Sequence, residues 1–394
     1  MRLNPRLALL SFGHFTIDSY SSFFAPLLPL LVAKLGLSLT RVGLLVALSS
    51  LASSMAQPLF GLVSDRMRHP WFIGFGPLAA ALFISALGLA PSYGALVTLL
   101  MCGGLGVAAF HPQAASLAGE VSPRRSMAMA FFVTAGTLGF SLGPLLAVGV
   151  VHGFGLQRTW LAAIPGVLIA LFLLVSVRRV GTVRHRVAAA RPRLSELRSV
   201  MRPLTLLYFA VVARSAVSYG FMTFLPLQLT HHGYTVIQAG AIASLYLACG
   251  ALGGFVGGWL AERWGGERVV LASFLGSAPL YLGFLFLPDA IGLVCLVAGS
   301  FILQASLPVN VVMGQELSPR HASTISSLLM GAAWGLGALI VSPVGALADR
   351  WGLHAALLSL AGMLLVGLTC AALLPAARTV VADLPEAVGG AAGD

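Results

Sequence analysis

The chain has 394 residues, of which 58% are hydrophobic and only 9% are charged, and its formal net charge is +11. A soluble domain has roughly 45–50% apolar and about 25% charged residues, so this composition excludes a water-soluble globule. The positive charge alone would be compatible with nucleic-acid binding. No basic stretch is interleaved with aromatic residues, however, so no nucleic-acid partner is expected.

Apolar runs recur along the chain and predict twelve membrane-spanning helices. About 20 residues suffice to cross the hydrocarbon core of a bilayer as a helix. The runs cover residues 7–35, 42–63, 71–90, 94–118, 126–150, 159–177, 204–229, 239–261, 269–287, 291–314, 323–346 and 355–375. Most connections between them are short and leave no room for a soluble catalytic domain. We therefore expect an all-α membrane protein that is not an enzyme.

The basic residues are unevenly distributed between the two sides of the predicted membrane domain. Of the 23 Lys and Arg residues, 18 fall on one side and four on the other, and Arg214 lies inside a span. Because loops rich in Lys and Arg stay in the cytoplasm, both termini are expected there. The chain is predicted to be a multi-pass protein of the inner (plasma) membrane.

The chain divides into two similar halves. Residues 178–203 contain eight Arg and two Pro and separate six spans from six. The run G-L-V-S-D-R at 61–66 matches G-W-L-A-E-R at 258–263, an offset of 197. Such matches on corresponding helices indicate parallel repeats related by an axis along the membrane normal. The expected parts are an N-terminal six-helix bundle at 1–178, a basic cytoplasmic linker at 179–203, a C-terminal bundle at 204–376 and a cytoplasmic tail at 377–394.

Twelve helices, a basic central loop and the paired G-x-x-x-[DE]-R loops resemble the major facilitator superfamily over essentially the whole chain. A narrower similarity, to the fosmidomycin-resistance group of drug exporters, rests on Gly13-His14 with Asp18, Gln57-Pro58, Phe110-His111-Pro112, Gln315-Glu316-Leu317 and the run G-F-S-L-G-P-L-L at 139–146. The resemblance implies a cleft between two rocking bundles, with helices 1, 4, 7 and 10 around it.

Asp18 stands near the middle of the first span, where a carboxylate must face a polar cavity, be paired or be protonated. His14 lies four residues earlier, on the same helix face. His111 lies in the fourth span. Histidine titrates near neutral pH, so these three residues are candidates for a proton pathway. The alternatives are a structural hydrogen bond for Asp18 and neutral packing for the histidines.

Arg214 aligns within one residue of Asp18 at the repeat offset, so both are expected near the membrane midplane. Its planar guanidinium suits a carboxylate or a phosphonate. Two roles stay open: Arg214 binds an anionic substrate, or it neutralises Asp18 in a structural or gating ion pair. The further polar candidates are Gln113, Gln304 and Asn310, which could instead form hydrogen bonds between helices. Exporters of the resembled group commonly carry Glu at the position of Gln113, which cannot exchange a proton.

The loop after the second span has a mechanical interpretation as a gate. Gly61 would let the helix end approach a neighbour closely, and Asp65 would bind a helix N-terminus across the bundle interface. Arg66 would pair with an acid such as Glu120. Further copies of the acid–Arg pair are Glu262-Arg263 in the second half and Asp349-Arg350, which falls on the opposite side of the membrane.

Small residues in the fifth span predict close helix packing; they are Gly136, Gly139, Gly143 and Pro144. By resemblance, G-x-x-x-G-P is typical of proton-coupled exporters, although Ala147-Val148 stands where the family often has two glycines. His231-His232 lies on an external loop with no third ligand evident, so no metal site is expected. No cofactor is expected either.

These features favour a proton-coupled secondary transporter that exports a small anionic or amphiphilic compound, such as a drug or a metabolite, by alternating access. Its expected partners are the small-molecule substrate, protons and the lipid bilayer, and we expect a monomer. A metabolite importer or an anion exchanger of the same fold is the alternative.

Overall fold

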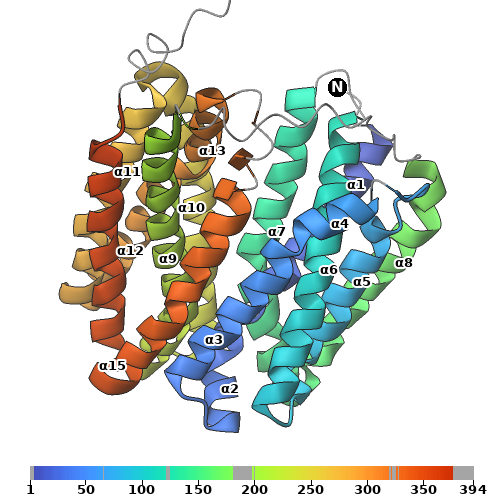
Figure 1. Ribbon diagram of the computed structural model, residues 1–394. Coiled ribbons are helices and arrows are strands. Elements are labelled where there is room, and N and C mark those ends of the chain that lie inside the picture. Colours follow the sequence, from blue (N-terminus) through green and yellow to red (C-terminus); the bar gives the residue numbers. More distant parts are fainter. Residues whose placement is uncertain are drawn as a thin grey trace, which may run out of the picture.

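The computed structural model describes residues 4–64, 66–120, 125–180, 198, 200–318, 321, 325–326 and 328–375. Within these residues the chain is helical and contains no strand. Figure 1 shows two helical bundles side by side, the N-terminal one in blue to light green and the C-terminal one in green to red. The predicted all-α membrane fold is confirmed. Most of the predicted linker, and all of the predicted tail, lie outside the described residues.

The N-terminal bundle contains α1 (Pro5–Ser21), α2 (Leu28–Leu35), α3 (Leu39–Ser50), α4 (Gln57–Ser64), α5 (Phe72–Ser85), α6 (Tyr93–Glu120), α7 (Arg125–Phe154) and α8 (Ala163–Val180). The apolar run at 7–35 is not one continuous helix, since a 3-10 turn at Ala25–Leu27 separates α1 from α2. Pro26 and Pro29 lie at this break, and the N–H groups that they lack cannot continue the helical hydrogen bonds. A π turn at Leu51–Met55 similarly precedes α4.

The C-terminal bundle contains α9 (Met201–His231), α10 (Val236–Trp264), α11 (Gly266–Phe286), α12 (Asp289–Gln304), α13 (Ser306–Leu317) and α15 (Ala333–Ala372). The tenth span is broken at Ala305, between α12 and α13. Pro308 follows three residues later, and it lacks the N–H that would bond the carbonyl of Gln304. In the first half, Pro112 lies inside the uninterrupted α6.

The C-terminal segment accounts for two of the twelve predicted spans. Eleven helical segments are long and apolar enough to cross a membrane, and the last of them covers 45 residues, Leu328–Ala372. A helix rises about 1.5 Å per residue, so 45 residues are roughly twice what one crossing needs. Gly352 interrupts the segment with φ 85° and ψ 165°. The chain therefore turns there, and the segment forms the eleventh and twelfth spans.

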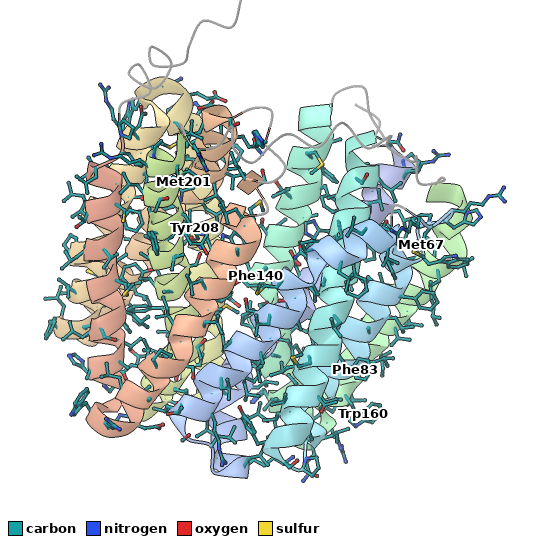
Figure 2. All side chains as sticks on the ribbon, viewed as in Figure 1. Met67, Phe83, Phe140, Trp160, Met201 and Tyr208 are labelled. Carbon is teal, nitrogen blue, oxygen red and sulfur yellow. The ribbon has the colours of Figure 1, made fainter. Side chains whose placement is uncertain are left out.

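Large apolar side chains cover the outer surface of both bundles. Figure 2 places Phe83 and Trp160 on the outer side of the N-terminal bundle, and both are exposed. Phe255 and Val175 are also exposed, at 79% and 81%. Contiguous apolar surface on this scale is stable only against lipid. The protein is therefore a multi-pass membrane protein.

The bundles contact each other most closely at the end away from the N-terminus, here called the distal end. There α3 lies against α15 (Figure 1), and a Cβ built on Gly43 would lie 2.6 Å from Cα of Ser342. A Cβ on Gly345 would lie 2.7 Å from the carbonyl carbon of Leu39. These glycines let two helix backbones touch, which closes this part of the interface between the bundles.

Candidate functional site

Asp18 on α1 is enclosed by two histidines. Its Oδ2 lies 3.2 Å from Nε2 of His14, one turn earlier on the same helix, and its Oδ1 lies 3.2 Å from Nε2 of His111 on α6. The i, i+4 spacing places His14 and Asp18 on one helix face, and α6 packs against α1. The structure thus joins the three residues into one buried cluster, here called the His–Asp–His cluster.

The second ring nitrogen of each histidine is held by a main-chain carbonyl. Nδ1 of His14 lies 2.9 Å from the carbonyl oxygen of Phe132 on α7, and Nδ1 of His111 lies 2.8 Å from that of Val107. The His14 ring also stacks on the Phe132 ring, with centroids 4.1 Å apart. A carbonyl oxygen only accepts, so each Nδ1 carries a hydrogen and donates it. This fixes both rings with Nε2 directed at the carboxylate.

The orientation of these rings decides which charges the cluster can hold. In a neutral ring with hydrogen on Nδ1, Nε2 carries a lone pair. A lone pair facing a carboxylate oxygen at 3.2 Å is repulsive unless a hydrogen or another cation lies between the two atoms. Both contacts become hydrogen bonds only when the cluster binds two hydrogens beyond those on the Nδ1 atoms.

Gly136 on α7 encloses the cluster from a third helix. A Cβ at this position would lie 2.7 Å from Oδ2 of Asp18 and would collide with Nε2 of His14. Gly139 and Gly143 continue the contact along the backbone of α1. The small-residue face of the fifth span is therefore a close helix contact, as the sequence predicts, and it also shapes the space around Asp18.

Arg214 on α9 is buried, with 3% of its surface exposed. Its Nη1 donates to Oε1 of Gln304 at 2.9 Å, and its Nη2 donates to Oγ of Ser215 at 3.2 Å. The guanidinium carbon lies 5.6 Å from the centre of the Trp334 ring, and Nε has no hydrogen-bond partner among the described residues. The sequence offered Arg214 and Gln304 as separate candidates, and nothing in it singled out Ser215 or Trp334.

The partners of Arg214 are neutral throughout the part of the chain that the structure describes. The side chains in contact with the Asp18 carboxylate are His14 and His111, and Arg214 forms no ion pair among the described residues. The bridge between Asp18 and Arg214, one of the two roles open from the sequence, is therefore not formed in this structure. A buried guanidinium without a counter-charge is costly, and an anion would relieve that cost.

The remaining amide candidates have different surroundings. Asn310 on α13 is 1% exposed, and within the described part of the chain neither its Oδ1 nor its Nδ2 has a hydrogen-bond partner. Gln113 on α6 donates from Nε2 to Oγ of Ser64 at 2.7 Å, while its Oε1 has no partner. Gln113 thus ties α6 to α4, whereas the unpaired amide of Asn310 can still bind a ligand.

The predicted gate after the second span is only partly visible. Asp65 and the side chain of Glu120 lie outside the described residues, and Arg66 is exposed. Among the described residues, a Cβ at Gly61 would meet nothing nearer than Cβ of Pro112, at 3.8 Å, so the close helix approach predicted for Gly61 is not formed between them.

In the second copy of this loop motif, Glu262 and Arg263 are both exposed. The Arg263 guanidinium carbon stacks 3.9 Å from the centre of the Trp259 ring. This contact lies within α10, so in this structure it does not link the two bundles.

The third acid–Arg copy connects the two bundles at the distal end. The Asp349 carboxylate on α15 accepts hydrogen bonds from the main-chain N–H of Leu39 at 2.7 Å and of Thr40 at 2.9 Å. It also accepts from the Thr40 hydroxyl at 2.6 Å. Leu39 and Thr40 begin α3, where unpaired N–H groups and the helix dipole favour an anion. Asp349 therefore caps a helix of the other bundle, and this contact is here called the distal latch.

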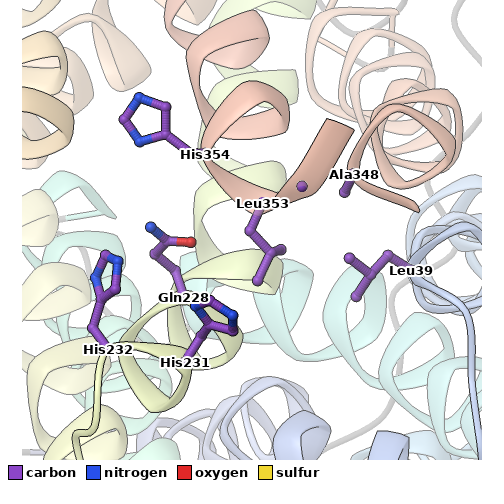
Figure 3. A pocket seen from close by; sticks show the side chains of 8 residues that line it. Leu39, Gln228, His231, His232, Ala348, Leu353 and His354 are labelled. Atoms are coloured by element: carbon purple, nitrogen blue, oxygen red, sulfur yellow. The ribbon is translucent and has the colours of Figure 1, made fainter. Parts of the chain in front are cut away.

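A cavity of about 370 Å³ lies beside the distal latch, between the end of α9, the turn at Gly352 and the start of α3. Figure 3 shows the residues that line it. His231 and His232 belong to this lining, and their ring centroids are 6.1 Å apart at an interplanar angle of 57°. The two rings diverge, so they do not offer a convergent pair of donors.

Comparisons with known proteins agree with this architecture. A family model described as the Major Facilitator Superfamily matches residues 10–342. The MFS-type transporter YfnC of Bacillus subtilis (strain 168) is 28% identical over 385 residues, covering 94% of this chain and 93% of the relative. The fosmidomycin resistance protein of Escherichia coli (strain K12) is 28% identical over 379 residues, covering 91% of each chain.

Solved structures share the fold. A bacterial homolog of the human lysosomal transporter Spinster, in an inward-facing and unoccupied conformation, gives a TM-score of 0.76 at 17% identity, covering 97% of this chain and 99% of the other. The nucleoside transporter NupG gives 0.72 at 14% identity, covering 94% and 99%. Since the family model matches most of the chain and the two-bundle fold agrees, this protein belongs to the major facilitator superfamily of membrane transporters.

Proposed function

We propose that this protein is a proton-coupled transporter that exports a small anionic or amphiphilic compound across the inner or plasma membrane. The observation that carries the proposal is the separation of ionisable groups between the two halves. Asp18 is shared by two histidines in the first half, and the Arg214 guanidinium has neutral partners in the second. The first group can carry protons while the second binds an anion.

The His–Asp–His cluster supports the proton part of the proposal. Its two Nε2–oxygen contacts need hydrogens, and an imidazole exchanges hydrogens near neutral pH. The cluster lies within the spans, where an ionisable group is rarely kept for structure alone. The absence of an acid at Gln113 is no obstacle, because Asp18 and the two histidines supply three titratable groups.

Arg214 supports the anion part. A guanidinium binds carboxylate or phosphonate oxygens in a bidentate manner, and the unpaired Nε of Arg214 is a donor still to be satisfied. The Trp334 ring beside it offers an apolar face, which suits an amphiphilic compound. Asn310 adds an unpaired donor and an unpaired acceptor from the tenth span.

Alternating access accounts for the arrangement of the interface. The N-terminal and C-terminal bundles are the moving parts, one copy of each suffices, and a monomer is the working unit. With both termini in the cytoplasm, the distal end is the outer end, and the distal latch holds the outside closed. Relatives named fosmidomycin resistance protein and multi-drug resistance efflux pump PmrA, the latter 25% identical over 288 residues, support export.

Transport by the purified protein in liposomes tests the proposal. We expect labelled fosmidomycin, or a member of a panel of small carboxylates and phosphonates, to accumulate inside when the lumen is acidic. Asp18→Asn should reduce accumulation to that of protein-free liposomes, because the variant lacks the carboxylate that organises both histidines. Exchange of labelled for unlabelled compound without a pH gradient should persist.

The matched control is Glu316→Gln, which removes an exposed carboxylate at the end of α13 and should leave accumulation unchanged. Full proton-driven accumulation by a well-folded Asp18→Asn variant would contradict the proton role of Asp18. An importer would instead accumulate compound when the outside is acidic. An anion exchanger would require a second anion inside and would ignore the pH gradient.

A further inference from the structure

We infer that the His–Asp–His cluster is a binding site for one divalent transition-metal ion, of which Zn²⁺ is the representative. The donors are Nε2 of His14, Nε2 of His111 and a carboxylate oxygen of Asp18, and they all lie within 4.8 Å of one another. No spacing in the sequence marks this donor set, because two of the donors lie on the first span and the third lies almost a hundred residues later.

The separations between donors suit direct coordination. Zn²⁺ binds histidine nitrogen at about 2.0–2.1 Å and carboxylate oxygen at about 2.0–2.2 Å. Two ligands of a tetrahedral ion at those distances are then about 3.4 Å apart. Each histidine Nε2 lies 3.2 Å from its carboxylate oxygen, so small side-chain rotations would admit the ion.

The hydrogen bonds behind the donors are those of a metal site. A histidine that binds metal through one nitrogen usually donates the other N–H to a carbonyl or carboxylate, which fixes the tautomer and the ring orientation. Both histidines do this here, His14 to the carbonyl of Phe132 and His111 to that of Val107. The lone pairs on Nε2 are thus already directed at the place where an ion would bind.

Gly136 provides the space. A Cβ at this position would fall 2.7 Å from Oδ2 of Asp18 and against Nε2 of His14, so a side chain of any size would obstruct the donors. With glycine there, no Cβ at position 136 obstructs the three protein ligands. Three protein ligands leave at least one coordination position for water or an anionic ligand.

The donor set selects the class of ion. Two imidazoles and one carboxylate suit Zn²⁺, Co²⁺, Ni²⁺ and Cu²⁺, whereas Mg²⁺ and Ca²⁺ prefer sites made entirely of oxygen. A divalent ion also supplies the positive charge that the facing lone pairs and carboxylate require. The metal ion would therefore take the place of the two hydrogens that otherwise lie between each histidine Nε2 and the Asp18 carboxylate, and the cluster cannot hold both at once. Binding itself does not depend on the proposed transport function.

Equilibrium binding to the purified protein in detergent, with any purification tag removed, tests this inference. We expect one equivalent of Zn²⁺ by calorimetry. Co²⁺ should give the intense visible absorption of a four- or five-coordinate ion, and Mg²⁺ should not compete. His14→Gln, His111→Gln and Asp18→Asn should each weaken Zn²⁺ binding by more than about tenfold, because each removes one ligand.

The double variant His231→Gln/His232→Gln is the matched control, because it removes two histidines from the distal cavity and none from the cluster. This control variant should still bind one equivalent of Zn²⁺. Unchanged Zn²⁺ affinity in folded His111→Gln and Asp18→Asn, or loss of the equivalent only in the control, would overturn the inference. Metal binding without proton-driven transport would refute the proposed function alone, and the reverse result would refute the metal site alone.

Discussion

The two halves share one scaffold, yet their polar interiors differ. At the repeat offset of 197, Asp18 corresponds to Ser215 and His14 corresponds to the buried Val211. The hydroxyl of Ser215 accepts a hydrogen bond from Arg214, so a polar group remains at the same depth while its charge has changed. The repeat therefore determines the depth at which a polar group lies, whereas the charge of that group differs between the two halves.

The backbones of the two halves differ at matching places as well. The fourth span continues through Pro112, whereas the tenth is broken at Ala305 before the matching Pro308. The break frees backbone groups beside Gln304, the partner of Arg214. Exchanging features between the halves is therefore the most direct way to test the comparison.

The largest effect is expected at Arg214, if the second half binds the anion independently of the first. Arg214→Gln should weaken anion binding by about a hundredfold, and Arg214→Lys by less, since Lys keeps the charge but loses the bidentate geometry. Equilibrium binding of the transported anion measures this. Adding Asp18→Asn should not restore affinity; recovery in the double variant would mean that Arg214 serves to neutralise Asp18.

Filling the space beside the His–Asp–His cluster should have the next largest effect. Gly136→Ala adds a methyl group that must displace His14 or Asp18. Overpacking of this kind costs about 1–3 kcal/mol, so we expect proton-driven accumulation to fall about tenfold. Gly149→Ala on the same helix is the control, since a Cβ there meets nothing within 4 Å. Equal behaviour of the two variants would show that Gly136 does not shape the cluster.

The distal latch should have a smaller effect. Asp349→Ala removes the acceptor of three hydrogen bonds at the start of α3 and leaves the Ser38 cap in place, and a loss of this kind corresponds to about a fivefold change in an equilibrium. Reactivity of a cysteine introduced at Leu39 with a membrane-impermeant reagent should rise by that factor, while affinity for the anion should change little. A variant in which Leu39 stays as protected as in the parent would show that the latch does not hold the distal end closed.

The smallest effect is expected at Gln113, where the first half carries an amide in place of the acid of related exporters. Gln113→Met keeps the volume, loses the hydrogen bond to Ser64 and removes the unpaired Oε1. The loss of the hydrogen bond destabilises the protein, and the removal of a buried unpaired oxygen stabilises it by a similar amount. Proton-driven flux should therefore change by less than about twofold. A loss comparable to that of Asp18→Asn would place Gln113 in the proton pathway.

The sequence predicts the fold well because the bilayer demands long apolar helices, and their number, order and repeat can be counted directly. It also pairs His14 with Asp18, because that contact lies within one helix. It does not show that His111 contacts Asp18 or that Gln304 contacts Arg214. Contacts between helices depend on the rotation and depth of each helix, which apolar runs do not encode.

Local motifs proved harder to interpret than the spans. Gly61 suggested a close approach that the described residues do not form, because a glycine near a helix end has the same appearance in sequence whether or not a neighbour touches it. The role of Asp349 was hidden for the opposite reason. Its partners Leu39 and Thr40 lie about 310 residues earlier, and a helix N-terminus offers main-chain donors that no side-chain pattern marks.

The cap of Asp349 on α3 also has a kinetic consequence. All three hydrogen bonds end on a single carboxylate, so α3 and α15 cannot separate at this end while any one of them is kept. Opening is then one concerted event with its own activation barrier, followed by hydration of the carboxylate and of the exposed start of α3. In the proposed transport cycle, breaking these three bonds would add to the barrier for opening the distal end, separately from the affinity for the transported compound.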